Sequence, residues 1–268
     1  MRFVYFTKEM YQLSIPQIIE FLTSAGVDGA DLAVRPRQPV NPENVETELP
    51  RAVQAFRAAG LIVGLVSAQT SLNDPDSDGA RRLFEACGKA GVPAIKLGYF
   101  QYTGGFDAAF ADARKRLTGF AKLAEKTGVR ACYHTHSGTF LGANGSALRL
   151  LLQDFDPHHI GAYLDTGHLA VGGGPFPLEV DMVRRWLTLV SIKDMVWQKA
   201  KDHWTPQVVP VEQGIVHWDE VARGLKEVAF DGTISLHGEY EVRDLDHRRE
   251  LAKQELASLK KWFGKDAR

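Results

Sequence analysis

The sequence predicts an α/β protein whose strands close into a (β/α)₈ TIM barrel, with residues 1–268 forming a single domain. Short apolar runs rich in Val, Ile and Leu alternate with amphipathic stretches of helical periodicity, and this alternation predicts a parallel sheet covered by helices. Eight such units in about 260 residues fit a closed barrel better than an open doubly wound sheet. The first apolar run is not followed by a Gly-x-Gly-x-x-Gly motif, which argues against the dinucleotide-binding alternative.

Strands are expected at the apolar runs, which are residues 2–6, 29–34, 61–66, 94–98, 129–134, 160–165, 189–194 and 232–237. Helices are expected between them, at residues 14–25, 43–59, 77–91, 106–127, 142–154, 178–187, 217–228 and 244–263. Ser14 followed by Pro16 is a typical start for the first helix. Four glycines end a helical stretch just before a strand, as a left-handed C-cap requires: Gly26, Gly60, Gly91 and Gly128.

Residues 195–216, between the seventh expected strand and the seventh expected helix, show no clear periodicity. We expect a long irregular loop at the carboxyl end of the barrel. A loop of this length in a compact domain is usually functional. Candidate site residues are therefore sought there as well as at the strand ends.

The composition excludes several classes of protein. The 33 acidic and 32 basic side chains give a net charge of -1, which provides no long-range attraction for a nucleic acid. No segment approaches 18 uncharged apolar residues, so a membrane span is not expected. The first residues are strand-like and lack the apolar region of a signal peptide, and two cysteines are too few for a disulfide framework. We expect a cytoplasmic protein with no nucleic-acid or membrane partner.

Four histidines stand at the ends of the fifth, sixth and eighth expected strands: His134, His136, His168 and His237. Active sites of such barrels lie at this end. Strand side chains alternate, so His134 should share a side with His136, and His237 with Glu239. With Asp165, these imidazoles and carboxylates fit a divalent metal centre of Mn, Co, Zn or Fe. The alternative is that each histidine is only a hydrogen-bonded or solvated side chain.

At these strand ends the sequence resembles the xylose isomerase-like barrel superfamily, which contains sugar (phosphate) isomerases and epimerases, inosose dehydratase and the AP endonucleases. The resemblance spans nearly the whole chain. It is carried by Asp165-Thr166-Gly167-His168, by Lys193-Asp194, by Gly214 within the stretch 211–216, and by the stretch 29–36. It implies the barrel fold and an activity on sugars or polyols.

Epimerases of this superfamily hold their metal with Glu, Asp, His and Glu from the ends of strands five to eight. The corresponding positions here are His134, Asp165, Ser191 and His237, so only Asp165 is retained. Inosose dehydratase is similar at the fifth strand, where it has Tyr-His-His-His. The resemblance thus implies a metal site of His134, Asp165 and His237, with Glu239 as a candidate fourth ligand.

The two replaced glutamates also bear on the reaction. In the epimerases they move a proton on either face of the substrate, whereas a metal-bound imidazole nitrogen has no lone pair left for a proton. We therefore expect the metal to stabilise an enediolate, with Glu239, Lys193 or His136 as the catalytic base. The predicted outcome is isomerisation, epimerisation by another route, or β-elimination from a keto sugar or keto polyol.

Further residues are candidate substrate contacts. His168 resembles the superfamily's contact to a substrate hydroxyl. Arg35, Lys96 and Tyr99 stand at or beyond the second and fourth strands, where they could bind a phosphate, a carboxylate or sugar hydroxyls, or simply be solvated at the rim. Trp197, in the long loop, could stack on a sugar, or pack the loop against a helix or another subunit.

The sequence thus predicts a divalent-metal-dependent sugar isomerase, epimerase or lyase with a small-molecule sugar or polyol substrate. A barrel that binds a carbohydrate or a partner without catalysis is the alternative, because the two glutamates are lost. An AP-endonuclease-like phosphodiesterase is disfavoured, since the chain lacks a basic groove and ligands for several metals. Asp194 lies on the opposite pleat from Lys193 and is expected to have a structural role. The oligomeric state is open, with a homo-oligomer among the possibilities.

Overall fold

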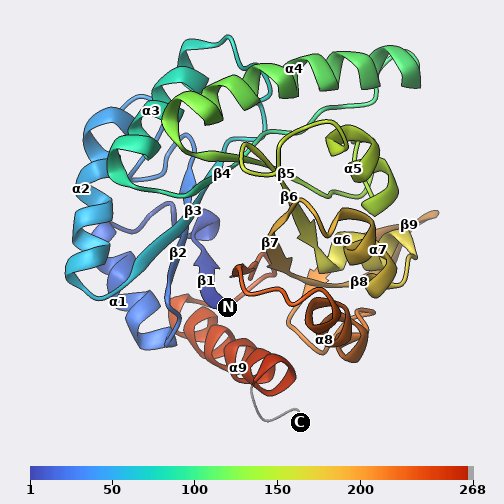
Figure 1. Ribbon diagram of the computed structural model, residues 1–268. Coiled ribbons are helices and arrows are strands. Elements are labelled where there is room, and N and C mark those ends of the chain that lie inside the picture. The colour runs from blue at the N-terminus through green and yellow to red at the C-terminus, as the bar shows by residue number, and fades with distance from the viewer. Residues whose placement is uncertain (265–268) are drawn as a thin grey trace.

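A computed structural model describes residues 1–264 of the chain. Eight parallel strands form a closed barrel in the order β1-β10-β7-β6-β5-β4-β3-β2 (Figure 1). These strands are β1 (Arg2–Phe6), β2 (Gly29–Val34), β3 (Ile62–Ala68), β4 (Ala94–Lys96), β5 (Arg130–His134), β6 (Ile160–Asp165), β7 (Leu187–Ile192) and β10 (Thr233–Leu236). The predicted (β/α)₈ architecture is confirmed.

Helices surround the barrel on its outer side (Figure 1). They are η1 (Lys8–Met10), α1 (Ile15–Ala25), α2 (Val45–Ala58), α3 (Asp78–Ala90), α4 (Phe106–Thr127), α5 (Gly145–Leu152), α6 (Thr166–Gly172), α7 (Phe176–Val183), α8 (Trp218–Glu227) and α9 (Leu245–Phe263). The four glycines expected at helix ends all have positive φ, from 71° at Gly128 to 77° at Gly26. Within residues 1–264, no helix has the length and hydropathy that a membrane span needs.

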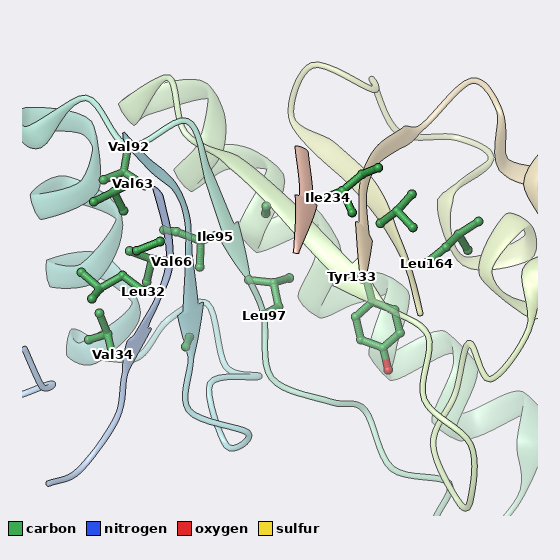
Figure 2. Packing of buried hydrophobic residues seen from close by; sticks show 14 of the residues in the cluster. Leu32, Val34, Val63, Val66, Val92, Ile95, Leu97, Tyr133, Leu164 and Ile234 are labelled. Carbon is green, nitrogen blue, oxygen red and sulfur yellow. The ribbon is translucent and has the colours of Figure 1, made fainter. Parts of the chain in front are cut away.

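The core has two layers. The larger lies between the strands and the helices, where Leu32, Val66 and Ile95 pack among other apolar side chains (Figure 2). The smaller fills the inside of the barrel with Val4, Leu65, Ala94, Cys132, Tyr163 and Leu189. Burial of each large apolar side chain stabilises the fold by roughly 1.5–3 kcal/mol.

The inner layer determines which side chains face the barrel mouth. Because side chains alternate along a strand, the residue two positions beyond each inner residue points to the same side. Five of these six positions are polar and buried: Ser67, Lys96, His134, Asp165 and Ser191. The sixth, two residues beyond Val4, is Phe6. Polar side chains therefore lie above the apolar inner layer, at the carboxyl ends of the strands.

The expectation of an irregular loop at 195–216 is wrong. The segment contains a two-stranded antiparallel hairpin of β8 (Asp194–Ala200) and β9 (His203–Val209), which lies beside α6 (Figure 1). Both strands are largely exposed on both faces, so no apolar alternation marks them. The short helix α6 was also not expected, and the helix expected at 178–187 instead spans Phe176–Val183.

Candidate active site

Three side chains at the barrel mouth could hold one metal ion. His134 ends β5, Asp165 ends β6 and His237 follows β10, and their potential ligand atoms lie within 4.8 Å of one another. All three are buried. His134 Nε2 lies 3.4 Å from Asp165 Oδ2, and the two imidazole rings are parallel with centroids 6.0 Å apart. Three of the four residues named as metal ligands are thus brought together.

The surroundings of this group fit a metal ion. Tyr99 Oη lies 3.1 Å from His134 Nδ1, whereas His134 Nε2 and His237 Nδ1 are buried without a hydrogen-bond partner among the described residues. Such nitrogens are costly to bury unless they bind something. Burial lowers the pKa of His134 well below its usual value, which favours the neutral form that ligates metals.

Asp165 is held in place from two elements. Ser191 of β7 donates a 2.8 Å hydrogen bond to its Oδ2, and the backbone N–H of His168 in α6 donates to its Oδ1 at 2.9 Å. Burial alone would raise the pKa of Asp165, but Lys193 and the neighbouring imidazoles of His168 and His134 hold it well below its usual value. The carboxylate form is therefore the one that faces the candidate metal.

Glu239 lies outside the three-residue group and is paired with lysines. Its Oε2 is 2.7 Å from Lys193 Nζ, and its Oε1 is 2.5 Å from Lys8 Nζ. Burial opposes both charges, but Glu239 and Asp165 raise the pKa of Lys193, and Lys193 and His237 hold that of Glu239 well below its usual value. Glu239 shares one side with His237, as expected, with Oε2 3.5 Å from His237 Nδ1.

The rings of the remaining two histidines lie against each other beside this cluster, tilted by 31°. The ring centroids of His136 and His168 are 3.8 Å apart. His136 Nδ1 lies 2.7 Å from the carbonyl oxygen of Ser137, and because a carbonyl only accepts, Nδ1 carries the proton and Nε2 the lone pair. His168 lies between Ser137 Oγ at 2.9 Å and Lys193 Nζ at 3.4 Å, and burial lowers its pKa to about 3.

Sequence reasoning missed Asp31 and Tyr163, which position His237. Tyr163 Oη lies 3.0 Å from His237 Nε2 and donates to Asp31 Oδ2 at 3.3 Å, and Ser235 Oγ donates to the same oxygen at 2.8 Å. Burial alone would lower the pKa of His237, but Asp31 and Glu239 raise it. The available signal was a carboxylate inside the otherwise apolar run 29–34, since a buried charge needs partners.

Arg35, Lys96 and Tyr99 also lie at the mouth. Lys96 is buried rather than solvated at the rim, with Nζ 3.8 Å from the Tyr99 ring centroid. Burial, with the Arg35 guanidinium, lowers the pKa of Lys96 well below its usual value. Arg35 Cζ is 5.2 Å from the ring of Phe6. Trp197 is different: it lies on β8 with 45% of its surface exposed, and within residues 1–264 its ring contacts none of the site's aromatic side chains.

Asp194 has the structural role expected of it. Its carboxylate accepts hydrogen bonds from the backbone N–H groups of Met195, Gly214 and Val216 and from Trp218 Nε1. A Cβ on Gly214 would lie 2.1 Å from Asp194 Oδ1, so only glycine fits at this position. The glycine recognised in the sequence is thus explained by its close approach to Asp194.

Comparisons with known proteins agree with this architecture. The family model described as "Xylose isomerase-like TIM barrel" matches residues 19–262. An inosose dehydratase of Lactiplantibacillus plantarum is 33% identical over 70 residues, which are 26% of this chain and 23% of that protein. The alignment therefore covers about a quarter of each.

Two solved structures illustrate the likeness in fold. The IOLI protein with a bound zinc atom has a TM-score of 0.78 at 16% identity, covering 98% of this chain and 100% of that one. The 3-keto-D-glucoside 4-epimerase YcjR from E. coli has a TM-score of 0.77 at 13% identity, covering 97% and 99%. The curated relative is named as a dehydratase and the E. coli structure as an epimerase. With the family model matching almost the whole described barrel, this chain belongs to the xylose isomerase-like TIM barrel family.

Proposed function

We propose that this protein is a divalent-metal-dependent enzyme that isomerises, epimerises or dehydrates a sugar or polyol. The observation that carries the proposal is the convergence of His134, Asp165 and His237 at the mouth of the barrel, where one buried nitrogen of each imidazole has no hydrogen-bond partner among the described residues. The activities named for the related inosose dehydratase and keto-glucoside epimerase support it, as does the zinc atom of the related IOLI structure. Two imidazoles and one carboxylate suit Zn, Mn, Co or Fe.

A bound divalent cation would polarise a substrate carbonyl and stabilise the enediolate formed when the neighbouring C–H loses its proton. We assign the base to His136. Its Nδ1–H donates to Ser137, which leaves the Nε2 lone pair for the substrate, and its ring is half-buried beside His168. A neutral imidazole that is not a metal ligand has a free nitrogen lone pair and can accept a proton, whereas a metal-bound nitrogen cannot.

Lys193 and Glu239 are assigned to charge stabilisation rather than to the metal. The ammonium of Lys193 lies within 3.6 Å of Asp165 and 2.7 Å of Glu239, which keep it protonated, so it can donate hydrogen bonds that stabilise negative charge on a leaving hydroxyl or on the enediolate. Glu239 uses its two oxygens for lysines, which makes it a weaker candidate for a fourth ligand. We assign His168, which lies beside Lys193, to a substrate hydroxyl, and exposed Trp197 to stacking on a sugar if the hairpin closes over the mouth.

Metal content and hydrogen exchange test the proposal together. The purified chain should contain about one divalent ion by elemental analysis, and His134→Ala and His237→Ala should lose it, while His158→Ala, at an exposed histidine, should not. In D₂O the protein should exchange the hydrogen beside the carbonyl of D-fructose, D-tagatose or an inosose. Full metal content in both site variants would contradict the ligand assignment. Binding of sugars without exchange or turnover would favour the non-catalytic alternative.

A further inference from the structure

One side of the barrel mouth contains buried polar atoms that no described residue satisfies. They are Asp31 Oδ1, Arg35 Nε, Ser67 Oγ and Lys96 Nζ. The residues come from adjacent strands, because Ala33 of β2 pairs with Ser67 of β3, and Ser67 pairs with Lys96 of β4. Asp31 and Arg35 flank Ala33 on the same pleat. We call these four residues the β2–β4 subsite.

The subsite borders both candidate histidine ligands. Lys96 Nζ lies 3.8 Å from the centroid of Tyr99, whose hydroxyl is 3.1 Å from His134. On the other flank, Arg35 packs on Phe6, and the Phe6 ring stacks on His237 at 4.5 Å. The β2–β4 subsite therefore adjoins the candidate metal site on the sides of both histidines.

Two of the four basic side chains at the barrel mouth are not ion-paired among the described residues. Lys193 and Lys8 are ion-paired with Glu239, but Arg35 and Lys96 have no ion pair among the described residues. The carboxylate of Asp31 raises the pKa of Lys96, but it forms no ion pair with Lys96 or Arg35 among the described residues, and its Oδ2 accepts from Tyr163 and Ser235. Because Lys96 is buried beside the half-buried Arg35, an anion from outside the chain would supply the countercharge that keeps the Lys96 amine protonated.

A carboxylate fits this subsite better than a phosphate. Phosphate sites use free backbone N–H groups, and the four that follow Lys96 are engaged by Cys132, Leu72 and Thr70 carbonyls and the Tyr133 hydroxyl. The free Oδ1 of Asp31 would also repel a doubly charged group, whereas it can accept a hydrogen bond from a hydroxyl beside a singly charged carboxylate.

We propose that the substrate is a hydroxylated carboxylic acid, a sugar acid rather than a neutral sugar. Lys96 and Arg35 bind its carboxylate, Ser67 donates a hydrogen bond to it, and Asp31 Oδ1 accepts from the neighbouring hydroxyl. This inference rests on the proposed function only in placing the substrate at the barrel mouth. Binding of the acid needs no turnover.

Matched pairs of acid and neutral sugar test the proposal by titration calorimetry on the full-length protein. The pairs are D-glucuronate with D-glucose, D-gluconate with D-glucitol, and 2-keto-D-gluconate with D-fructose, with D-glucose 6-phosphate as the phosphate probe. In at least one pair the acid should bind ten-fold tighter or more. Lys96→Met should abolish that preference and Arg35→Met should reduce it. Lys122→Met, on the exposed face of α4, should keep it and leave the affinity for both members of the pair unchanged.

Equal binding within every pair, no binding of any acid, or a preference that survives Lys96→Met would overturn the proposal. Stronger binding of the sugar phosphate than of every acid would assign the subsite to phosphate instead. The outcomes also separate this inference from the proposed function. If the protein binds acids through Lys96 but contains no metal and catalyses no hydrogen exchange, the sugar-acid proposal holds and the proposed enzymatic function is wrong. If it catalyses exchange on neutral ketoses and shows no preference for acids, the proposed function holds and the sugar-acid proposal is wrong.

Discussion

On the side of the mouth formed by β6, β7 and β10, the buried charges Asp165, Lys193 and Glu239 pair with one another. On the side formed by β2, β3 and β4, Lys96 and Arg35 are left without an ion pair and Ser67 without a hydrogen bond among the described residues. The first arrangement fixes its groups before any substrate arrives, as catalysis requires. The second arrangement lowers the stability of the free protein, because its buried polar groups lack partners. It favours binding of a ligand that supplies those partners.

The largest effect is expected where the paired side is broken. Asp165→Ala should abolish metal binding and lower the free energy of unfolding by about 3–5 kcal/mol, because it removes the carboxylate beside the His134 ring and one of the two carboxylates paired with buried Lys193. Elemental analysis and urea denaturation measure the two effects. The matched control is Asp154→Ala, which breaks an exposed pair with Arg114 and should change stability by about 1 kcal/mol at most. Equal effects in the two variants would contradict the contrast between the buried and exposed pairs.

The assignment of His136, which follows β5 and lies against His168, as the general base is tested next. His136→Gln should lower kcat by about 10²–10⁴-fold if His136 is the general base, with metal content unchanged because the residue is not a ligand. Deuterium exchange and elemental analysis on the same preparation check both statements. A variant that keeps full exchange would return the base to Glu239 or Lys193.

Another buried carboxyl belongs to Glu255 of α9. It accepts a hydrogen bond from the Val211 N–H and lies near Tyr240 and Arg248. Burial raises its pKa to about 7. A pKa raised in the folded state stabilises the protein below the usual value of 4.5, and this contribution is lost as the pH rises towards 7. The loss should be on the order of 3 kcal/mol. Glu255→Gln should flatten the pH dependence of unfolding between 4.5 and 7, and an unchanged profile would show that another group titrates there.

The smallest effect, of opposite sign, is expected on the unpaired side. Lys96→Met removes a buried amine that has no hydrogen-bond partner or ion pair among the described residues, and it should raise the free energy of unfolding by about 1–3 kcal/mol. Lys193→Met, the matched change on the paired side, should lower it. Urea denaturation of both variants gives the comparison directly. The distinction between the two sides fails if both lysines prove equally stabilising.

The barrel could be predicted from the sequence because the alternation of apolar runs and amphipathic stretches is local, and the strand ends then located His134, Asp165 and His237. Asp31 was missed because its partners Tyr163 and Ser235 lie far away in the chain and meet it only across the closed barrel. The hairpin was missed because its exposed strands carry no apolar pattern. Which cations stay unpaired depends on side-chain positions such as Lys96 over Tyr99, which no spacing in the sequence encodes.

The hydrogen bonds of Asp194 have a consequence for engineering. By accepting from Met195 on one side and from Gly214 and Val216 on the other, this one carboxylate closes the base of the β8–β9 hairpin. Since the ends of the insert are already joined, changes in the length of its tip add little loop-closure entropy. Residues 198–206, the outer part of the β8–β9 hairpin, can therefore be replaced by other sequences without changing the barrel.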